Sequence, residues 1–342
     1  MNDHHAYDDP YDDYAADFDP MQVDRRARRR RKPKARHTPK RSAAEIIETL
    51  ADETEGLEGG FQTTYQPAQH EAVWLYDSLR TFYDQALITD VLAVVKGGKE
   101  ASVYRCAAHP STGETLLAAK VYRPRMFRNL RNDARYKQGR DILSAEGHQV
   151  KQNERRIMKA VGKKSAFGES IAHTSWLMHE FTTLQHLHAL GASVPRAVMA
   201  GNNAILMQYL GDERQAAPTL NRVTLTPDEA QRLFEATLRN IALLLGEGLV
   251  HGDLSAYNIL YWEGTIKLID FPQVVYAPEN DDAYAILARD VQRVCEYFAG
   301  QGVACDSQAE TNRLWAGVVG DQYENRAADF SRAALPEDDD AD

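Results

Sequence analysis

The chain has 342 residues, of which 43% are hydrophobic and 26% charged, a composition typical of a globular protein with one large domain or two modest ones. No run approaches roughly 18 consecutive apolar residues, so no membrane-spanning segment is expected. The acidic, polar start (MNDHHAYDDP) does not resemble a secretory signal. Cys106, Cys295 and Cys305 form no CxxC pair, which argues against a disulfide framework or a zinc site and fits a reducing, cytoplasmic location.

The formal net charge of −10 is unevenly distributed along the chain. Residues 1–24 contain eight aspartates, whereas residues 25–41 contain eleven lysines and arginines. Neither block can bury enough apolar area to offset the entropy of ordering, so we expect residues 1–60 to form a disordered tail, first acidic and then basic. Residues 326–342 are expected to form a second, acidic tail. The basic run is compatible with a solvated tail or with an arm that binds RNA by releasing counterions.

Ordered structure is expected to begin near Phe61. The helical spacing of apolar residues predicts a helix over residues 71–85. Alternating apolar residues, separated by glycine and asparagine turns, then predict five strands with one helix inserted after the third. In chain order these are two strands within residues 87–109, a strand at 115–123, the inserted helix at 174–190 and a hairpin within 193–211.

The second half of the chain is predicted to be mainly helical. Thr226 can cap a helix whose first turn holds Pro227, and Glu229 completes a capping-box pattern. A wide apolar stripe predicts that this helix is buried. The sequence therefore predicts an α+β protein with a sheet-rich lobe at residues 61–210, a mainly helical lobe at residues 211–325 and a ligand cleft between them. Short strands and further helices follow the buried helix, at 258–262, 266–270, 280–300 and 307–320.

A glycine-rich segment, KGGKEASV, joins the first two predicted strands. Glycines allow backbone N–H groups to approach phosphate oxygens, and lysine and serine side chains add donors. The segment lacks the third glycine of a GxGxxG pattern, so on its own an ordinary hairpin turn is the better interpretation. Its candidate nucleotide-binding residues are Lys96, Gly97, Gly98, Lys99, Ser102 and Val103.

Lys120 lies in the middle of the third predicted strand, between apolar neighbours, so its side chain should face a cleft or a partner. In protein kinases a strand lysine in this position contacts the α- and β-phosphates and pairs with a glutamate of the inserted helix. Glu180 is the candidate for that glutamate. The alternative interpretation is an edge-strand lysine exposed to solvent.

The strongest signal is HGDLSAYNIL at residues 251–260. Asp253 would orient and deprotonate the attacking hydroxyl, and Asn258 would ligate a metal ion. Asp270, twelve residues after Asn258, supplies the second metal ligand, and these two suffice for Mg²⁺ because nucleotide phosphates complete its shell. The alternative is a helix-terminal loop in which these side chains satisfy backbone donors. His251 is expected to brace the loop.

These motifs resemble the RIO family of atypical serine/threonine protein kinases, in particular bacterial-like members of its first branch. The resemblance covers roughly residues 85–305 and implies a protein-kinase-like bilobal fold, ATP as the phosphoryl donor, and Mg²⁺ or Mn²⁺ as the metal. KGGKEASVY is similar to the phosphate loop of that family, LLAAKVYR to its lysine strand, TSWLMHEF to its WxxxE helix, ILMQYLG to its hinge, HGDLSAYNIL to its catalytic loop and IDFPQ to its metal-binding segment.

The resemblance also implies a role for each matching residue. Lys120 and Glu180 would form the ion pair, Asp253 would be the catalytic aspartate, and Asn258 and Asp270 would be the metal ligands. Asp270 would in addition be able to accept the phosphoryl group as an aspartyl-phosphate. The adenine pocket would be lined by the gatekeeper and the hinge, which are Met207, Gln208, Tyr209 and Leu210.

Three features depart from the family pattern or from ordinary protein kinases. Lys96 and Gly97 replace a Ser-Thr pair at the start of the phosphate loop. Residues 120–164 contain fourteen lysines and arginines against four acids, so this segment is compatible with an RNA clamp or with a solvated, mobile insert. No long activation segment follows Asp270, which implies that ordinary docking of peptide substrates is missing.

Three functions are compatible with these residues. The first is a RIO-type serine/threonine protein kinase with an unidentified protein substrate, ATPase activity and an aspartyl-phosphate intermediate. The second is a small-molecule phosphotransferase of the aminoglycoside or choline type, which also uses HGDxxxxN but favours other residues after the metal-binding aspartate. The third is an ATP-driven switch on a ribosome-related RNA–protein assembly, which the basic segments 25–41 and 120–164 favour.

Overall fold

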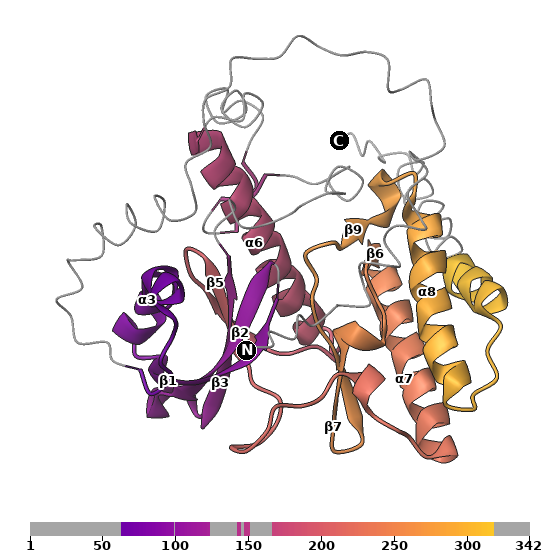
Figure 1. Ribbon diagram of the computed structural model, residues 1–342. Coiled ribbons are helices and arrows are strands. Elements are labelled where there is room, and N and C mark those ends of the chain that lie inside the picture. Colours follow the sequence, from indigo (N-terminus) through magenta and orange to yellow (C-terminus); the bar gives the residue numbers. More distant parts are fainter. Residues whose placement is uncertain (1–62, 99, 124–141, 145–146, 151–165, 318–342) are drawn as a thin grey trace, which may run out of the picture. The chain divides into compact units, whose positions relative to one another are not determined.

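The computed structural model describes residues 63–98, 100–123, 142–144, 147–150 and 166–317 (Figure 1). Both predicted tails, the basic run at 25–41, most of the basic segment at 120–164, and Lys99 lie outside the described residues. In the part that is described, a sheet-rich lobe is followed by a mainly helical lobe, which confirms the predicted α+β, kinase-like architecture.

Five antiparallel strands form the sheet of the first lobe, in the order β1-β2-β3-β5-β4. Buried and partly exposed side chains alternate along β2, as the pleat of a strand requires. The five predicted strands are therefore confirmed. Their bounds are β1 Ile88–Gly97, β2 Ala101–Ala108, β3 Leu116–Tyr122, β4 Ala197–Ala200 and β5 Ala204–Gln208.

Each face of this sheet is covered by a helix (Figure 1). The helix α3, Gln69–Asp84, buries Leu75 and Leu79 in one apolar cluster together with Val121 of β3. The longer helix α6, Ala166–Ala189, packs on the opposite face. It begins at residue 166 rather than at the predicted residue 174, because its first turns lie ahead of the apolar stripe from which the prediction was made.

The pleat of β3 decides which side chains meet α6. Ala118 and Tyr122 lie in the same apolar cluster as Leu177 and Phe181 of α6. Lys120 lies between Ala118 and Tyr122 with the same two-residue spacing, so its side chain points to the α6 side of the sheet. The fold therefore turns the predicted phosphate-binding lysine toward the helical lobe.

The second lobe is built mainly from helices. Thr226 caps the helix α7, Pro227–Gly246, by accepting a hydrogen bond from the N–H of Glu229 at 3.4 Å. The Glu229 carboxylate accepts a hydrogen bond from the Tyr261 hydroxyl at 2.6 Å. The helices are α7 Pro227–Gly246, α8 Ala283–Gly300 and a helix over 307–317. Two short antiparallel pairs join β6 Leu249–Val250 with β9 Val275–Tyr276 and β7 Ile259–Trp262 with β8 Thr265–Leu268.

Short 3₁₀ turns connect these elements. They are η3 Pro110–Thr112, η5 Leu220–Arg222, η6 Ala256–Asn258 and η7 Ala277–Glu279. None of the helices in the described ranges has both the length and the apolar character needed to cross a bilayer.

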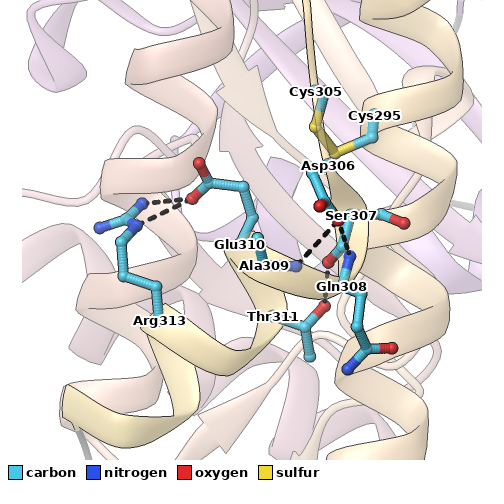
Figure 2. Close-up of a disulfide and its surroundings, with 9 residues drawn as sticks. All are labelled: Cys295, Cys305, Asp306, Ser307, Gln308, Ala309, Glu310, Thr311 and Arg313. Carbon is cyan, nitrogen blue, oxygen red and sulfur yellow. Dashed lines mark hydrogen bonds and ion pairs between the residues drawn. A yellow bond between two sulfur atoms is a disulfide. The ribbon is translucent and has the colours of Figure 1, made fainter.

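A disulfide joins Cys295 of α8 to Cys305 (Figure 2), so the part of the cysteine-based expectation that argued against disulfides is wrong. The chain turns back after α8 through Gly302, which has a φ of 91°. This turn brings the two Cα atoms to 5.5 Å, within the range that a disulfide spans. A count of cysteines and their spacing contains no information on such a turn. Asp306 then begins the next helix by accepting hydrogen bonds from the N–H groups of residues 308 and 309.

Candidate active site

Lys120 lies at the centre of a charged cluster drawn from both lobes. The strand register places Lys96 opposite Val103 and Val103 opposite Lys120, so these three residues share one face of the sheet. Lys120 Nζ lies 2.6 Å from Glu180 Oε1 on α6 and 2.6 Å from Asp270 Oδ1. The Lys120 side chain is only 12% exposed. The structure therefore brings together the lysine, the glutamate and the aspartate that the sequence singled out.

The carboxylate of Glu180 is buried and engaged on both of its oxygens. Oε1 accepts hydrogen bonds from Lys120 and from the backbone N–H of Phe271, and Oε2 accepts one from the Tyr122 hydroxyl. Burial raises the pKa of Tyr122 well above its ordinary value, and the neighbouring charge of Glu180 adds to that effect. Tyr122 therefore remains a donor. This set of partners offsets the desolvation cost of a carboxylate in the core.

The charges of Lys120 and Asp270 support one another. Burial alone would lower the pKa of Lys120, but the carboxylates of Asp270 and Glu180 together raise it well above its ordinary value. Burial would likewise raise the pKa of Asp270, but the Lys120 ammonium holds it below its ordinary value. Both groups are therefore ionised at neutral pH, the state in which a lysine can attract phosphate and a carboxylate can ligate a cation.

The β7–β8 hairpin brings the two predicted metal ligands together. Asn258 comes directly before β7, and Asp270 follows β8 by two residues. The N–H of Ile269 donates to the backbone carbonyl of Asn258 at 3.0 Å, which closes the open end of the hairpin. Asp270 has a φ of 71°, a left-handed conformation that aspartate tolerates better than most residues. Its side chain is 41% exposed and so remains accessible.

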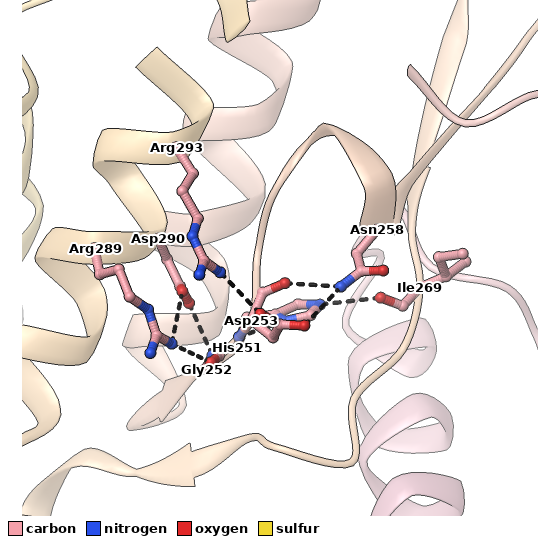
Figure 3. A network of polar contacts seen from close by, with 8 residues as sticks. All are labelled: His251, Gly252, Asp253, Asn258, Ile269, Arg289, Asp290 and Arg293. Atoms are coloured by element: carbon pink, nitrogen blue, oxygen red, sulfur yellow. Dashed lines mark hydrogen bonds and ion pairs between the residues drawn. The ribbon is translucent and has the colours of Figure 1, made fainter. Parts of the chain in front are cut away.

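The Asp253 carboxylate lies next to Asn258 (Figure 3). Asn258 Nδ2 donates to the backbone carbonyl of Asp253 at 2.8 Å and to its Oδ2 at 3.2 Å. Because the amide nitrogen is used in this way, the amide oxygen of Asn258 is the atom available to a cation. The predicted catalytic aspartate and the predicted metal ligands thus belong to one constellation.

His251 braces this loop, as predicted from its position. Its Nδ1 accepts a hydrogen bond from the N–H of Asp253 at 3.3 Å, so Nε2 carries the proton and donates to the carbonyl of Ile269 at 3.1 Å. The ring also packs 4.6 Å from the ring of Phe271, measured between centroids. One side chain therefore ties the catalytic loop to the segment that holds Asp270.

The helix α8 fixes the same loop from another direction (Figure 3). The N–H of Gly252 donates to Asp290 Oδ2 at 2.8 Å, and the carbonyl of Gly252 accepts from the Arg289 guanidinium. Asp290 is 1% exposed, and its burial raises its pKa although His251 and Arg289 oppose that rise. From the next turn of α8, Arg293 Nη1 donates to Asp253 Oδ1 at 2.8 Å.

The residues of the glycine-rich segment do not all lie on the face of the sheet that carries Lys120. Gly97 ends β1 opposite Ser102, directly after Lys96, which shares one face of the sheet with Lys120, and Gly98 follows Gly97. Ser102 is paired with Val121 and is 3% exposed, so its side chain points to the α3 side, away from Lys120. The Ser102 hydroxyl therefore lies outside the cluster around Lys120, contrary to the prediction that it contributes to the nucleotide site.

The predicted hinge connects β5 to the helical lobe. Met207 is 9% exposed and paired with Ala118 of β3. The N–H of Gln208 donates to the carbonyl of Arg196, and the carbonyl of Leu210 accepts from the N–H of Ala217, both at 2.8 Å. The Tyr209 hydroxyl donates to the carbonyl of Asp212 at 3.3 Å. These bonds hold the strand end and the loop after it in a fixed arrangement.

Four residues of this site are missing from the sequence-based set. Tyr122 lies two positions after Lys120, so the strand period alone would have placed it on the same face. The other three, Arg289, Asp290 and Arg293, share one face of α8 by their helical spacing. Their partners lie in the catalytic loop, nearly forty residues earlier in the chain, and no local pattern shows which helix face meets that loop.

The donor set at Asn258 and Asp270 fits a divalent cation that arrives with a nucleotide. An amide oxygen and a carboxylate are the hard ligands that Mg²⁺ and Mn²⁺ bind. In the described ranges no three His, Cys, Asp or Glu side chains are grouped closely enough to hold a metal ion. Phosphate oxygens and water would therefore complete the shell, which is how Mg²⁺ is bound at phosphoryl-transfer sites.

Comparisons with known proteins agree with this geometry. Serine/threonine-protein kinase RIO1 of Chaetomium thermophilum is 30% identical over 231 residues, which cover 64% of this chain and 41% of that protein. RIO-type serine/threonine-protein kinase Rio1 of Haloferax volcanii is 27% identical over 237 residues, which cover 69% of this chain and 71% of that protein. RIO-type serine/threonine-protein kinase Rio1 of Methanocaldococcus jannaschii is 28% identical over 220 residues, which cover 64% of this chain and 66% of that protein.

The chain thus spans about two fifths of the length of the Chaetomium relative. The sequence model of one family, described as the RIO domain, matches residues 102–311. That match covers more than half of the chain and includes the lysine strand, the catalytic loop and the metal-binding segment. The chain therefore belongs to the RIO family.

Proposed function

We propose that this protein is an ATP-dependent serine/threonine protein kinase of the RIO type. The observation that carries the proposal is the position of Lys120, which contacts the buried Glu180 on one side and the partly exposed Asp270 on the other. A lysine held in this way is the phosphate-binding group of protein kinases. The names of the relatives, which are serine/threonine-protein kinases, support the same function.

The nucleotide would enter from the α6 side of the sheet. The gatekeeper Met207 and the hinge at residues 208–210 would hold the adenine. The backbone of residues 96–98 would meet the phosphates together with Lys120 and, outside the described ranges, Lys99. Glu180 keeps the ammonium of Lys120 fixed, so Lys120 can orient the phosphates with little loss of entropy on binding.

Asn258 and Asp270 would hold Mg²⁺ or Mn²⁺ through the amide oxygen and the carboxylate. When bound, such a cation neutralises charge on the phosphate oxygens. Asp253 would accept a hydrogen bond from the acceptor hydroxyl and take up its proton as the bond from oxygen to the γ-phosphorus forms and the bond to ADP breaks. His251 and Asp290 keep the loop that carries Asp253 in place.

An ATP-driven switch is the second candidate, and the exposure of Asp270 favours it. Its carboxylate would attack the γ-phosphorus, ADP would leave, and water would then release phosphate from the aspartyl-phosphate. The chain reaches α8 at Ala283 soon after Asp270, and the Ala-Pro-Glu tripeptide at Ala277–Glu279 falls within that short stretch. A stretch this short would leave little room for a segment that docks peptide substrates, which suits a protein that hydrolyses ATP on a partner.

Radiolabelled ATP with wild type, Asp253→Ala and Asp270→Ala would separate these functions. Label on serine that resists hydroxylamine and disappears in Asp253→Ala supports the kinase. Label that hydroxylamine removes, and that Asp270→Ala alone abolishes, supports the switch. A wild type that phosphorylates only an aminoglycoside or choline contradicts both and favours the small-molecule phosphotransferase.

We further propose that the basic segments 25–41 and 120–164 bind RNA of a ribosome-related assembly and that the protein acts in the cytoplasm, where ATP is available. Their density of positive charge supports this. RNA affinity should fall steeply with salt concentration. If it survives deletion of residues 1–60, binding belongs to 120–164, and if no RNA binds at low salt, this part of the proposal fails.

A further inference from the structure

Arg293 of α8 has no part in the reaction as described so far, yet it contacts the proposed catalytic aspartate. Its Nη1 donates to Asp253 Oδ1 at 2.8 Å (Figure 3). The Arg293 side chain is 33% exposed and that of Asp253 is 24% exposed, so the pair lies at the accessible side of the loop. Asp253 is the polar partner that Arg293 has within the described part of the chain.

The two carboxylate oxygens of Asp253 are held from two directions. Arg293 binds Oδ1 from α8, and Asn258 Nδ2 binds Oδ2 from within the loop. The rotation of the carboxylate is therefore set by both contacts. If Arg293 were absent, Asp253 would be an unpaired anion one hydrogen bond from Asn258, and a cation held by Asn258 would attract it as a further ligand.

Arg293 is not needed to attach α8 to the loop. Asp290 and Arg289 already bind the N–H and the carbonyl of Gly252. Asp290 is buried, whereas the Arg293 side chain is partly exposed. The contact of Arg293 with Asp253 is therefore not required to hold α8 against the loop. Because it acts directly on the Asp253 carboxylate, it points to a role for Arg293 in the reaction. A guanidinium suits that role, because its charge is permanent and its donors have a fixed planar geometry.

We propose that Arg293 is a positioning residue for phosphoryl transfer. It holds the Asp253 carboxylate toward the acceptor hydroxyl and keeps it out of the ligand shell of the cation at Asn258 and Asp270. This inference rests on the proposed function, since it assigns Arg293 a task within that same site.

The test compares Arg293→Ala and Arg293→Lys with Gln292→Ala, the matched control. Gln292 is the neighbouring residue on α8, and within the described ranges its side chain bonds to Glu296, in an exposed pair. Arg293→Ala should lower kcat about 10- to 100-fold, the range expected when a reacting group is misplaced, and leave KM for ATP within about twofold because the nucleotide contacts are intact. Arg293→Lys should restore part of kcat because it keeps the charge.

A second measurement does not depend on turnover. Binding of Mn²⁺ to the complex with a non-hydrolysable ATP analogue, followed by electron paramagnetic resonance, should become tighter in Arg293→Ala because Asp253 becomes free to join the shell. In an Asp253→Asn background, Arg293→Ala should change neither the Mn²⁺ affinity nor the residual ATP turnover, since the group through which Arg293 acts is gone.

Three results would overturn the inference. One is a kcat and Mn²⁺ affinity of Arg293→Ala that match those of Gln292→Ala. Another is a loss of kcat that only follows a loss of folded protein in thermal melting, which would make Arg293 a structural residue. The third is a further loss in the Asp253→Asn background. A wild type without any ATP turnover would overturn the proposed function as well, and so is distinguishable from these.

Discussion

Lys120 contacts two carboxylates that differ strongly in exposure. The Glu180 side chain is 1% exposed, whereas that of Asp270 is 41% exposed. The buried carboxylate fixes the lysine, and the exposed one can exchange its contact with Lys120 for a phosphate or a cation. This difference in exposure between the two partners is consistent with the proposed role of Lys120 in binding a nucleotide.

Glu180→Ala should lower the free energy of unfolding by roughly 3–5 kcal/mol, because it leaves the buried Lys120 partly uncompensated and removes the acceptor of Tyr122. Glu180→Gln should cost less, since an amide oxygen still accepts a hydrogen bond. Urea denaturation gives both values. The control is Glu114→Ala, whose ion pair with Arg196 is 35% and 42% exposed and should contribute less than about 1 kcal/mol. Equal costs for Glu180→Ala and Glu114→Ala would contradict the prediction.

Asp270 and Asp290 should affect acid stability in opposite directions. The pKa of Asp270 is lowered in the folded state, so its contribution is present above the ordinary carboxyl pKa and is lost as pH falls through the lowered value. The pKa of Asp290 is raised, so the folded state binds that proton more tightly and stability declines as pH rises from the ordinary pKa through the raised one.

The stability of wild type relative to Asp270→Asn should therefore shrink as pH falls below about 4, the ordinary aspartate value. The stability of wild type relative to Asp290→Asn should instead shrink as pH rises above about 4. Urea midpoints measured across this range check both trends. Parallel curves for wild type and both variants would show that neither carboxyl has a shifted pKa.

At the scale of elements, the catalytic loop depends on a glycine that no other residue can replace cheaply. Gly252 has a φ of 84°, and a Cβ there would lie 2.2 Å from the backbone carbonyl oxygen of Gln273. Gly264, in the β7–β8 turn, has a similar φ of 74°, but the nearest atom to its Cβ would be 3.6 Å away, on the Arg232 side chain. Alanine at Gly264 would therefore add backbone strain alone, whereas alanine at Gly252 would add both backbone strain and a steric clash.

Gly264→Ala should cost about 1–2 kcal/mol, the penalty of a left-handed backbone. Gly252→Ala should cost more than Gly264→Ala and should also lower phosphoryl transfer, because relief of the clash must move the loop that carries Asp253. Chemical denaturation and ATP turnover check the pair. Similar costs, with turnover intact in both variants, would show that the loop tolerates the displacement.

The disulfide anchors the helix at 307–317 to α8. Cys305→Ser opens a loop of ten residues in sequence separation, and the chain-entropy relation gives a loss of roughly 2–3 kcal/mol. Cys106→Ser is the control for loss of a thiol, because Cys106 is free and buried and its replacement leaves the Cys295–Cys305 bond in place. Dithiothreitol should lower the thermal midpoint of wild type and leave Cys305→Ser unchanged. An equal response of the two proteins would show that the bond does not form in solution.

Most elements were predictable because their signals are local. The period of two in β2 and β3 and the Thr226 cap of α7 require only neighbouring residues. The spacing of Asp253, Asn258 and Asp270 predicted one constellation because the short β7–β8 hairpin connects them. The contacts of α8 with the loop and the Cys295–Cys305 bond were not predictable, since both depend on how segments far apart in sequence or separated by a turn meet in space.

At the scale of the molecule, the two lobes share an apolar core. One cluster of buried residues contains Tyr122 and Phe181 from the sheet lobe together with Leu254, Phe271 and Phe298 from the helical lobe. Phe271 follows Asp270 directly, so the segment that carries Asp270 is anchored in the common core. A ligand that contacts Lys120 and Asp270 therefore stabilises elements of both lobes.

A non-hydrolysable ATP analogue with Mg²⁺ should therefore raise the thermal midpoint of the whole unfolding transition. At a concentration about 100 times its dissociation constant, the gain is about 2.7 kcal/mol. Asp270→Ala should lose most of the part that depends on Mg²⁺, whereas Gln292→Ala should keep it. Scanning calorimetry with and without chelator checks this. A gain that is independent of Mg²⁺ in wild type would contradict the assignment of Asp270 as a ligand.

The single ammonium at the centre of the cluster also spans the two lobes. Lys120 and Glu180 belong to the sheet lobe through β3 and α6, whereas Asp270 follows β8 of the helical lobe. Of the two carboxylates that contact Lys120, that of Glu180 comes from the same lobe and that of Asp270 from the other. Because Asp270 is partly exposed, its attraction to Lys120 weakens as ionic strength rises. Lys120 therefore joins the two lobes through an ion pair that weakens as ionic strength rises.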